Sequence, residues 1–159
     1  MFESKPINGT REQNYESVIQ QMDALLTGES DIIANLSNTS ALLNQFLDQI
    51  NWVGFYLYRD GELVLGPFQG LPACIRIPLS KGVCGKAASD KTTVRVGNVH
   101  LFPGHIACDS ASQSEIVVPI IVGGELFGVL DIDSPILDRF DEVDQHYLEL
   151  FVNQLSTHL

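Results

Sequence analysis

The chain has 159 residues, of which 45% are hydrophobic, and its 20 acidic and nine basic residues give a formal net charge of −11. This length predicts a single domain, residues 1–159, with a sizeable core, and this composition excludes a disordered chain. The acidity disfavours binding to nucleic acid or to an anionic membrane surface, and no apolar run approaches the roughly 20 residues that span a bilayer.

Helical spacing of apolar residues predicts two amphipathic helices in the first third of the chain. The first helix ends at the Thr27-Gly28 break, and the second runs over residues 32–50. A short helix is predicted over 82–90, and Asp141 is predicted to cap a closing helix. The apolar positions of that closing helix are Val143, Tyr147, Leu150, Phe151 and Leu155.

Extended apolar runs predict a sheet built from hairpins. Residues 52–58 and 62–68 are joined across Asp60-Gly61, a strong turn signal, and residues 115–122 and 125–133 are joined across Gly123-Gly124. Shorter strands are predicted over 74–79 and 92–99, and a polar loop over about 100–114. Consecutive hairpins and grouped helices predict an α+β fold, with an antiparallel sheet that helices cover on one face.

Alternation along the strands divides their side chains between two faces. The aliphatic sets, among them Leu126, Leu130 and Ile132, are candidates for the helix-covered core, and Phe127 falls on the opposite face. That opposite face gathers aromatic and acidic residues and is typical of a small-molecule site. A sheet face that is simply exposed to solvent explains the same pattern. A β-bulge would also move residues from one face to the other. The predicted pocket residues are Trp52, Tyr56, Glu115, Asp131 and Asp133.

The three cysteines, Cys74, Cys84 and Cys108, are an odd number, which argues against a static disulfide scaffold. Cys108 has the most polar context, since it follows a Pro-Gly-His turn and precedes a Ser-rich loop, where a thiol is placed to react. Cys84 fits a packing role best, although its place near a helix N-terminus could lower its pKa. Buried, inert thiols remain the ordinary alternative for each of them.

Two other chemistries are compatible with these residue types. Cys74, Cys84, His105 and Cys108 have zinc-ligand chemistry, but their spacing contains no C-x₂-C knuckle, so we predict no metal. A hydrolytic dyad of Cys108 with His105 is weak because no oxyanion hole is indicated nearby. We expect His105 and His100 to fix the loop through hydrogen bonds.

The segments FQGLPAC, KGVCGKA, NVHLFPGHIACDSASQSEIVVPI, GVLDIDSP and FDEVD resemble the free methionine-(R)-sulfoxide reductases, single-domain members of the GAF superfamily. The resemblance extends from about Tyr15 to the closing helix. It implies a central antiparallel sheet with the N- and C-terminal helices on one face and the ligand pocket on the other. It also implies thiol-dependent reduction of free L-methionine-(R)-sulfoxide.

The resemblance also implies roles for individual residues. Cys108 is the expected nucleophile, Cys74 the principal resolving cysteine, and Cys84 a third thiol whose role is open. Trp52, Tyr56, Glu115, Asp131 and Asp133 match the substrate-binding positions of the family. The expected course is attack by Cys108 on the sulfoxide sulfur, protonation of the oxygen by Glu115, a sulfenic acid on Cys108, and a disulfide with Cys74.

The expected external reductant is a thioredoxin-type protein, supplied by NADPH through thioredoxin reductase, and no bound cofactor is expected. The N-terminus lacks a basic start followed by an apolar stretch, so the sequence predicts no secretory signal and a cytoplasmic location. The amphipathic helices at both ends are compatible with a homodimer. A ligand-binding GAF sensor and a redox sensor without substrate specificity are the rival functions, although a sensor would leave the three cysteines without a task.

Overall fold

The structure, a computed structural model, describes residues 2–3 and 8–159. In chain order its elements are α1 (Arg11–Leu26), α2 (Ile32–Phe46), β1 (Trp52–Arg59), β2 (Glu62–Gly70), β3 (Arg76–Pro78), α3 (Gly82–Asp90), β4 (Val94–Val96), the short 3₁₀ helix η1 (Val99–Leu101), β5 (Ser114–Val122), β6 (Glu125–Ser134) and α4 (Glu142–Ser156). The strands form one antiparallel sheet in the order β3-β2-β1-β6-β5-β4.

The two long hairpins follow from their turn residues. Asp60 and Gly61, with φ of 50° and 86°, connect β1 to β2, and Gly123 and Gly124, with φ of 59° and 80°, connect β5 to β6. Positive φ at both central residues gives the turn whose twist matches the twist of paired strands. Because β6 also pairs with β1, the two hairpins join into a single sheet. The α+β prediction is therefore confirmed.

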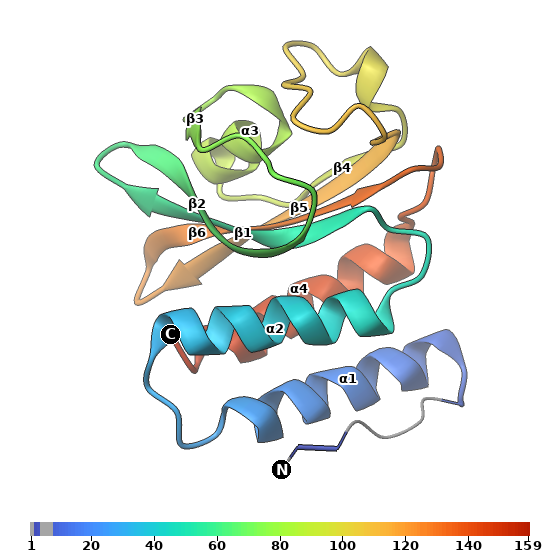
Figure 1. Cartoon of the computed structure of the whole chain (residues 1–159), viewed down its shortest axis with the longest axis vertical. Helices are drawn as coiled ribbons and strands as arrows, with labels where there is room; N and C mark the ends of the chain where they lie inside the picture. Colours follow the sequence, from blue (N-terminus) through green and yellow to red (C-terminus); the bar gives the residue numbers. More distant parts are fainter. Residues whose placement is uncertain (1, 4–7) are drawn as a thin grey trace.

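The elements form layers (Figure 1). α2 and α4 lie against one face of the sheet, α1 packs on those two helices, and α3 lies with the long loops on the other face. The larger core fills the helix side, where Phe55, Leu130 and Phe151 are fully buried. A second cluster, which contains Trp52 and Tyr56, lies under α3. The terminal helices and the predicted pocket face thus lie on opposite sides of the sheet, as expected.

Helix ends are fixed by side-chain caps. Thr10 and Gln13 form a capping box at the start of α1, and the Asp141 side chain accepts hydrogen bonds from two backbone N–H groups at the start of α4, as predicted. The second helix ends at Phe46 rather than at residue 50, because the following residue is extended and Gln49 has a φ of 52°. Within the described residues no helix is long and apolar enough to cross a membrane.

The assignment of side chains to the two sheet faces is wrong at one place in β6, for a local reason. Ile120 pairs with Gly128, but Ile121 pairs with Leu126, so Phe127 is an extra residue in β6. A bulge of this kind exchanges the faces of the residues on its two sides. Leu126 therefore packs on the α3 side and Phe127 on the helix side, the reverse of the alternation pattern.

Two further predictions need correction. The strands expected over 74–79 and 92–99 shorten to β3 and β4, so Cys74 precedes β3 instead of opening a strand. β3 pairs with β2 only as far as Val64. Shortly after Val64, near Pro67, the register between β2 and β1 shifts, and Pro67 has no N–H to donate to a neighbouring strand. In α4, Leu150 is 41% exposed, and Leu148 takes the buried position instead.

Candidate functional site

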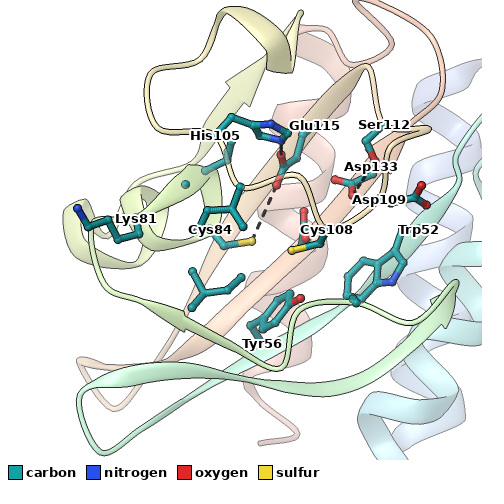
Figure 2. A pocket seen from close by; sticks show the side chains of 16 residues that line it. Trp52, Tyr56, Lys81, Cys84, His105, Cys108, Asp109, Ser112, Glu115 and Asp133 are labelled. Carbon is teal, nitrogen blue, oxygen red and sulfur yellow. Dashed lines mark hydrogen bonds and ion pairs between the residues drawn. The ribbon is translucent and has the colours of Figure 1, made fainter.

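The five predicted pocket residues line one pocket on the sheet face that α3 covers (Figure 2). Trp52 and Tyr56 come from β1, Glu115 from β5, and Asp131 and Asp133 from β6. Asp133 lies opposite Trp52 on one side and opposite Glu115 on the other, so one row crosses three strands. The alternation pattern therefore identified the pocket face correctly, because all five residues lie away from the β6 bulge.

The aromatic wall of the pocket is held in place by stacking and by hydrogen bonds. The Trp52 ring stacks on Tyr56 and on Phe68, with ring centroids 5.9 and 5.1 Å apart. Trp52 Nε1 donates to the carbonyl of Leu71 at 3.1 Å, and the Tyr56 hydroxyl donates to the carbonyl of Cys74 at 2.9 Å. Both bonds tie the pocket to the 71–74 segment, and they fix an apolar surface of defined shape.

The three acids lie close together, with Glu115 and Asp131 buried and Asp133 partly buried. Burial, followed by the charges of Asp131 and Asp133, raises the pKa of Glu115 well above its usual value. Burial also raises the pKa of Asp131 to about 6 and, with the charge of Asp131, raises that of Asp133. The buried Oδ1 atoms of Asp131 and Asp133 accept no hydrogen bond within the described part of the chain. The pocket can therefore hold both a proton and a cationic group.

The cysteines divide into a bonded pair and a free thiol. Cys74 and Cys108 form a disulfide, with Cα atoms 5.5 Å apart, and Cys108 lines the pocket. Cys84 is free and buried, and its Sγ donates to Glu115 Oε1 at 3.9 Å (Figure 2). The site thus combines a disulfide-bonded pair of sulfur atoms with a third thiol and an acid.

Burial of Cys84 agrees with the packing role favoured from the sequence, and the alternative, a pKa lowered by the N-terminus of α3, does not hold. Burial, followed by the charges of Asp131 and Glu115, raises that pKa well above its usual value. The helix N-terminus offers at most a partial positive charge, whereas full burial and nearby carboxylates penalise a thiolate more strongly. Cys84 is therefore held as a neutral thiol.

A chain of polar contacts, which the sequence did not predict, fixes the Cys108 loop to the sheet. Asn51 Nδ2 donates to Asp109 Oδ2 at 2.9 Å and to Ser112 Oγ at 3.1 Å, and Ser112 Oγ donates to Asp133 Oδ2 at 3.1 Å. Asp109 directly follows Cys108 in the chain. These bonds join residues 58 and 61 positions apart, so spacing gave no signal beyond the polar character of the loop.

The zinc-type and dyad arrangements are not assembled. Cys74 and Cys108 are bonded to each other in the disulfide and therefore do not act as zinc ligands. His105 Nε2 lies 3.9 Å from Glu115 Oε2. Burial, followed by the charge of His100, lowers the pKa of His105, so this imidazole is a neutral neighbour of the acid at neutral pH. Cys84, Glu115 and Asp131 do bring one ligand atom each within 4.8 Å of one another, which is a set of metal-ligand types.

A helix-covered antiparallel sheet with a ligand pocket on its other face defines a GAF-type domain, here with cysteines in the pocket. The family model of the GAF domain matches residues 31–159. The free methionine-R-sulfoxide reductase of Escherichia coli is 51% identical over 142 residues, which cover 89% of this chain and 86% of that protein. The chain belongs to the free methionine-R-sulfoxide reductases of the GAF family, which are oxidoreductases.

Solved structures agree with this assignment. The structure of fRMsr of Staphylococcus aureus in complex with substrate is 54% identical, with a TM-score of 0.88, over 98% of this chain and 99% of that chain. Free methionine-R-sulfoxide reductase from Neisseria meningitidis in complex with its substrate is 44% identical, with a TM-score of 0.95, over 99% and 95% of the two chains. The family resemblance drawn from the sequence motifs is thereby confirmed.

Proposed function

We propose that this chain reduces free L-methionine-(R)-sulfoxide to L-methionine, through a sulfenic acid on Cys108 and a disulfide with Cys74. One observation carries the proposal: Cys108, already in a disulfide, lines a pocket that also holds a stacked Trp52 and three coupled acids. The relatives named as free methionine-R-sulfoxide reductases, in Escherichia coli and Saccharomyces cerevisiae, support the substrate class.

The substrate binds between the aromatic wall of the pocket and its acidic residues. The methyl end of the substrate packs on the Trp52 ring, which is 3% exposed and held by its bond to the Leu71 carbonyl. The substrate ammonium group approaches Asp131 and Asp133, whose buried Oδ1 atoms have no hydrogen-bond partner within the described residues. A buried carboxylate gains most from a cationic partner, so these atoms favour a free amino acid.

The chemical step is a two-electron exchange between two sulfur atoms. The Cys108 thiolate attacks the sulfoxide sulfur and forms a transient bond between the two sulfur atoms. The oxygen then moves to the Cys108 sulfur as the S–O bond of the substrate and the bond between the sulfur atoms break, and methionine leaves as the reduced product. The oxygen ends on Cys108 as a sulfenic acid, and Glu115 supplies the proton that it requires. Glu115 is suited to this because burial raises its pKa well above the usual value, which favours a protonated carboxyl group.

Protonation of the acids also reduces the cost of forming the Cys108 thiolate. Three ionised carboxylates would oppose a nearby negative sulfur. Burial raises the pKa of Glu115, of Asp131 and of Asp133, which favours their protonated forms and lowers the negative charge that faces Cys108. The ammonium group of a bound substrate compensates that remaining charge.

The second half of the cycle restores the thiols. Cys74 attacks the sulfur of the Cys108 sulfenic acid, water leaves, and the disulfide forms. An external protein dithiol of the thioredoxin type, supplied by NADPH, then reduces this bond. The need for such a reductant fits a reducing compartment such as the cytoplasm. No bound cofactor takes part in these steps.

The test is methionine formation from each sulfoxide epimer by pre-reduced protein, in single turnover and with a thioredoxin system. We expect turnover with the R epimer of the free amino acid, and none with the S epimer or with a peptide-bound sulfoxide. Cys108→Ser should abolish single turnover, whereas Cys74→Ser should keep one turnover and lose recycling by thioredoxin. Full single-turnover activity of Cys108→Ser would refute the assignment of the nucleophile.

A further inference from the structure

The Cys74–Cys108 disulfide has two unlike surroundings. Cys108 lines the pocket between the sheet and α3. Among the described residues that form this lining, Cys74 is not included, and its neighbours Leu71 and Ile75 are 63% and 68% exposed. Both cysteines are partly buried. Small substrates therefore meet the bond at Cys108, whereas Cys74 lies outside the pocket lining, beside exposed residues.

Exposed apolar side chains surround this outer approach. Ile75 adjoins Cys74, and the carbonyl of Ile106 accepts a hydrogen bond from the N–H of Cys108 at 3.1 Å. Because the two cysteine Cα atoms are 5.5 Å apart, the disulfide brings both isoleucines to the same site. Together with Leu71 they form what we call the apolar collar: Leu71, Ile75 and Ile106, which are 63%, 68% and 36% exposed. Grouped exposed apolar residues indicate a contact surface.

The charge around the collar differs from that of the rest of the chain. Residues 70–81 and 98–108 contain no Asp or Glu, although the whole chain has 20 acidic residues. Their basic residues are Arg76 and Lys81. Glu62 forms an ion pair with Arg76, and Asp109 directly follows Cys108, so the surface carries less negative charge than a protein of net charge −11 does on average. A partner with an apolar, non-basic contact face fits it.

We propose that the apolar collar is the docking surface for the protein dithiol that recycles this enzyme, and that this dithiol attacks Cys74 rather than Cys108. The proposal rests on the proposed function, because it requires that substrate turnover leaves the disulfide. The partner thiolate bonds to Cys74 Sγ, the Cys74–Cys108 bond breaks, and Cys108 leaves as a thiolate. The second thiol of the partner then attacks the mixed disulfide, and Cys74 leaves reduced while the partner is oxidised.

This direction of attack has a functional consequence. Cys108 is released into the pocket in the thiolate form that the next substrate needs. Attack on Cys108 would instead take place where that residue lines the pocket with Trp52, Cys84 and Glu115, which are all buried. Ile106 of the collar also lines the pocket, whereas Leu71 and Ile75 lie outside the lining and offer the reductant a separate contact surface.

The first test traps the mixed disulfide. A purified thioredoxin whose second active-site cysteine is replaced by Ser is incubated with the oxidised enzyme, and the cross-linked peptides are identified by mass spectrometry. We expect the bond on Cys74, with Cys108 free to react with an alkylating agent. A bond found mainly on Cys108 would overturn the proposal. This experiment needs no variant of the enzyme.

The second test compares Ile75→Glu with Ile33→Glu, a matched control whose 53% exposed side chain lies on α2, on the other side of the sheet. Replacing an apolar contact by a charge should lower kcat/KM for thioredoxin about fivefold or more. Single-turnover methionine formation and recycling by dithiothreitol should not change. An unchanged kcat/KM for thioredoxin would refute the docking surface.

Two further outcomes are distinguishable. If the collar covers a second copy of this chain, Ile75→Glu will change the molecular mass measured by ultracentrifugation, and the docking proposal is then wrong. If instead the reduced wild-type protein forms no Cys74–Cys108 disulfide on addition of methionine-R-sulfoxide, the proposed function fails. That failure is visible without any thioredoxin, so it is separate from a failure of the collar.

Discussion

Glu115 and Asp131 lie on the adjacent strands β5 and β6, and each brings a carboxylate oxygen within 4.8 Å of the other and of Cys84 Sγ. They are not directly opposite, since Glu115 pairs with Asp133 and Val117 with Asp131. Diagonal neighbours on one sheet face remain within reach of each other. Because both carboxyl groups are buried, each opposes ionisation of the other, and this coupling underlies the acid chemistry proposed for the site.

This coupling makes the stability of the protein depend on pH in a defined direction. The pKa of Glu115 is raised on folding, so the native state binds more protons than the unfolded state once the pH exceeds the usual pKa. The free energy of unfolding contributed by this group therefore falls as the pH rises toward the folded pKa. We expect Glu115→Gln to become progressively more stable than wild type as the pH rises above the usual pKa of a Glu carboxyl group, about 4.3. Parallel Tm curves for the two proteins would contradict this.

The catalytic part of the same proposal predicts a different result for activity. Glu115→Gln keeps the size of the side chain but cannot supply a proton to the sulfoxide oxygen. General acid catalysis contributes typically about 10²–10⁴-fold, so we expect single-turnover methionine formation to fall at least about 100-fold. Rapid-quench measurement with pre-reduced protein checks this. A fall of less than about tenfold would assign the proton to another group.

Cys84 is predicted to react slowly with alkylating agents. Its side chain is 4% exposed and its pKa is raised by burial and by the neighbouring acids, so the native protein contains little thiolate at this position. Iodoacetamide at pH 8 should leave Cys84 unmodified in the folded, oxidised protein and should modify it after unfolding in guanidinium. After mild reduction, Cys108 should react first. Rapid native labelling of Cys84, read by mass spectrometry, would contradict the assignment of a neutral thiol.

Asn51 is predicted to be a positioning residue for the Cys108 loop. Asn51→Ala removes two hydrogen bonds, to Asp109 and to Ser112, while Trp52 and the sheet remain. We expect a lower rate of disulfide formation after substrate addition, with little change in substrate KM, and a loss of about 1–3 kcal/mol in stability. Asn44→Ala, an exposed position on α2, is the control and should change neither value. A change in KM alone would instead indicate a role in substrate binding.

Pocket residues could be predicted from the sequence where their side-chain chemistry and their spacing along a strand indicate the face on which they lie. Trp52 and Tyr56 are four residues apart on one strand, so their side chains point to the same face of the sheet. The acids on β5 and β6 follow the same two-residue alternation, so the pocket face could be predicted. The two-residue alternation gave the wrong face only around Phe127, which is an extra residue in β6 and exchanges the two faces. A bulge has no reliable signature in a single sequence, and only the pairing partner reveals it.

Polar contacts between residues far apart in the chain could also not be predicted from the sequence. The bonds from Asn51 to the Cys108 loop depend on how β1 and β5 are placed relative to each other, which neither hairpin turn determines alone. The sequence left both a packing role and a lowered pKa open for Cys84, for a related reason. Its position at a helix start is local and visible, whereas its burial beside Glu115 and Asp131 depends on the packing of α3 on the sheet.

Gly54 offers a test of how closely β1 and β2 must approach behind the aromatic wall. A Cβ added at Gly54 would collide with the Cβ of Phe68 and lie 2.9 Å from the carbonyl oxygen of Pro67, so Phe68 has to move. Phe68 stacks on Trp52, and Trp52 is the single tryptophan of the chain. We expect Gly54→Ala to shift the Trp52 emission, to raise substrate KM more than it lowers kcat, and to cost about 1–3 kcal/mol of stability. Unchanged emission together with an unchanged KM would mean that the strand relaxes without disturbing the aromatic wall.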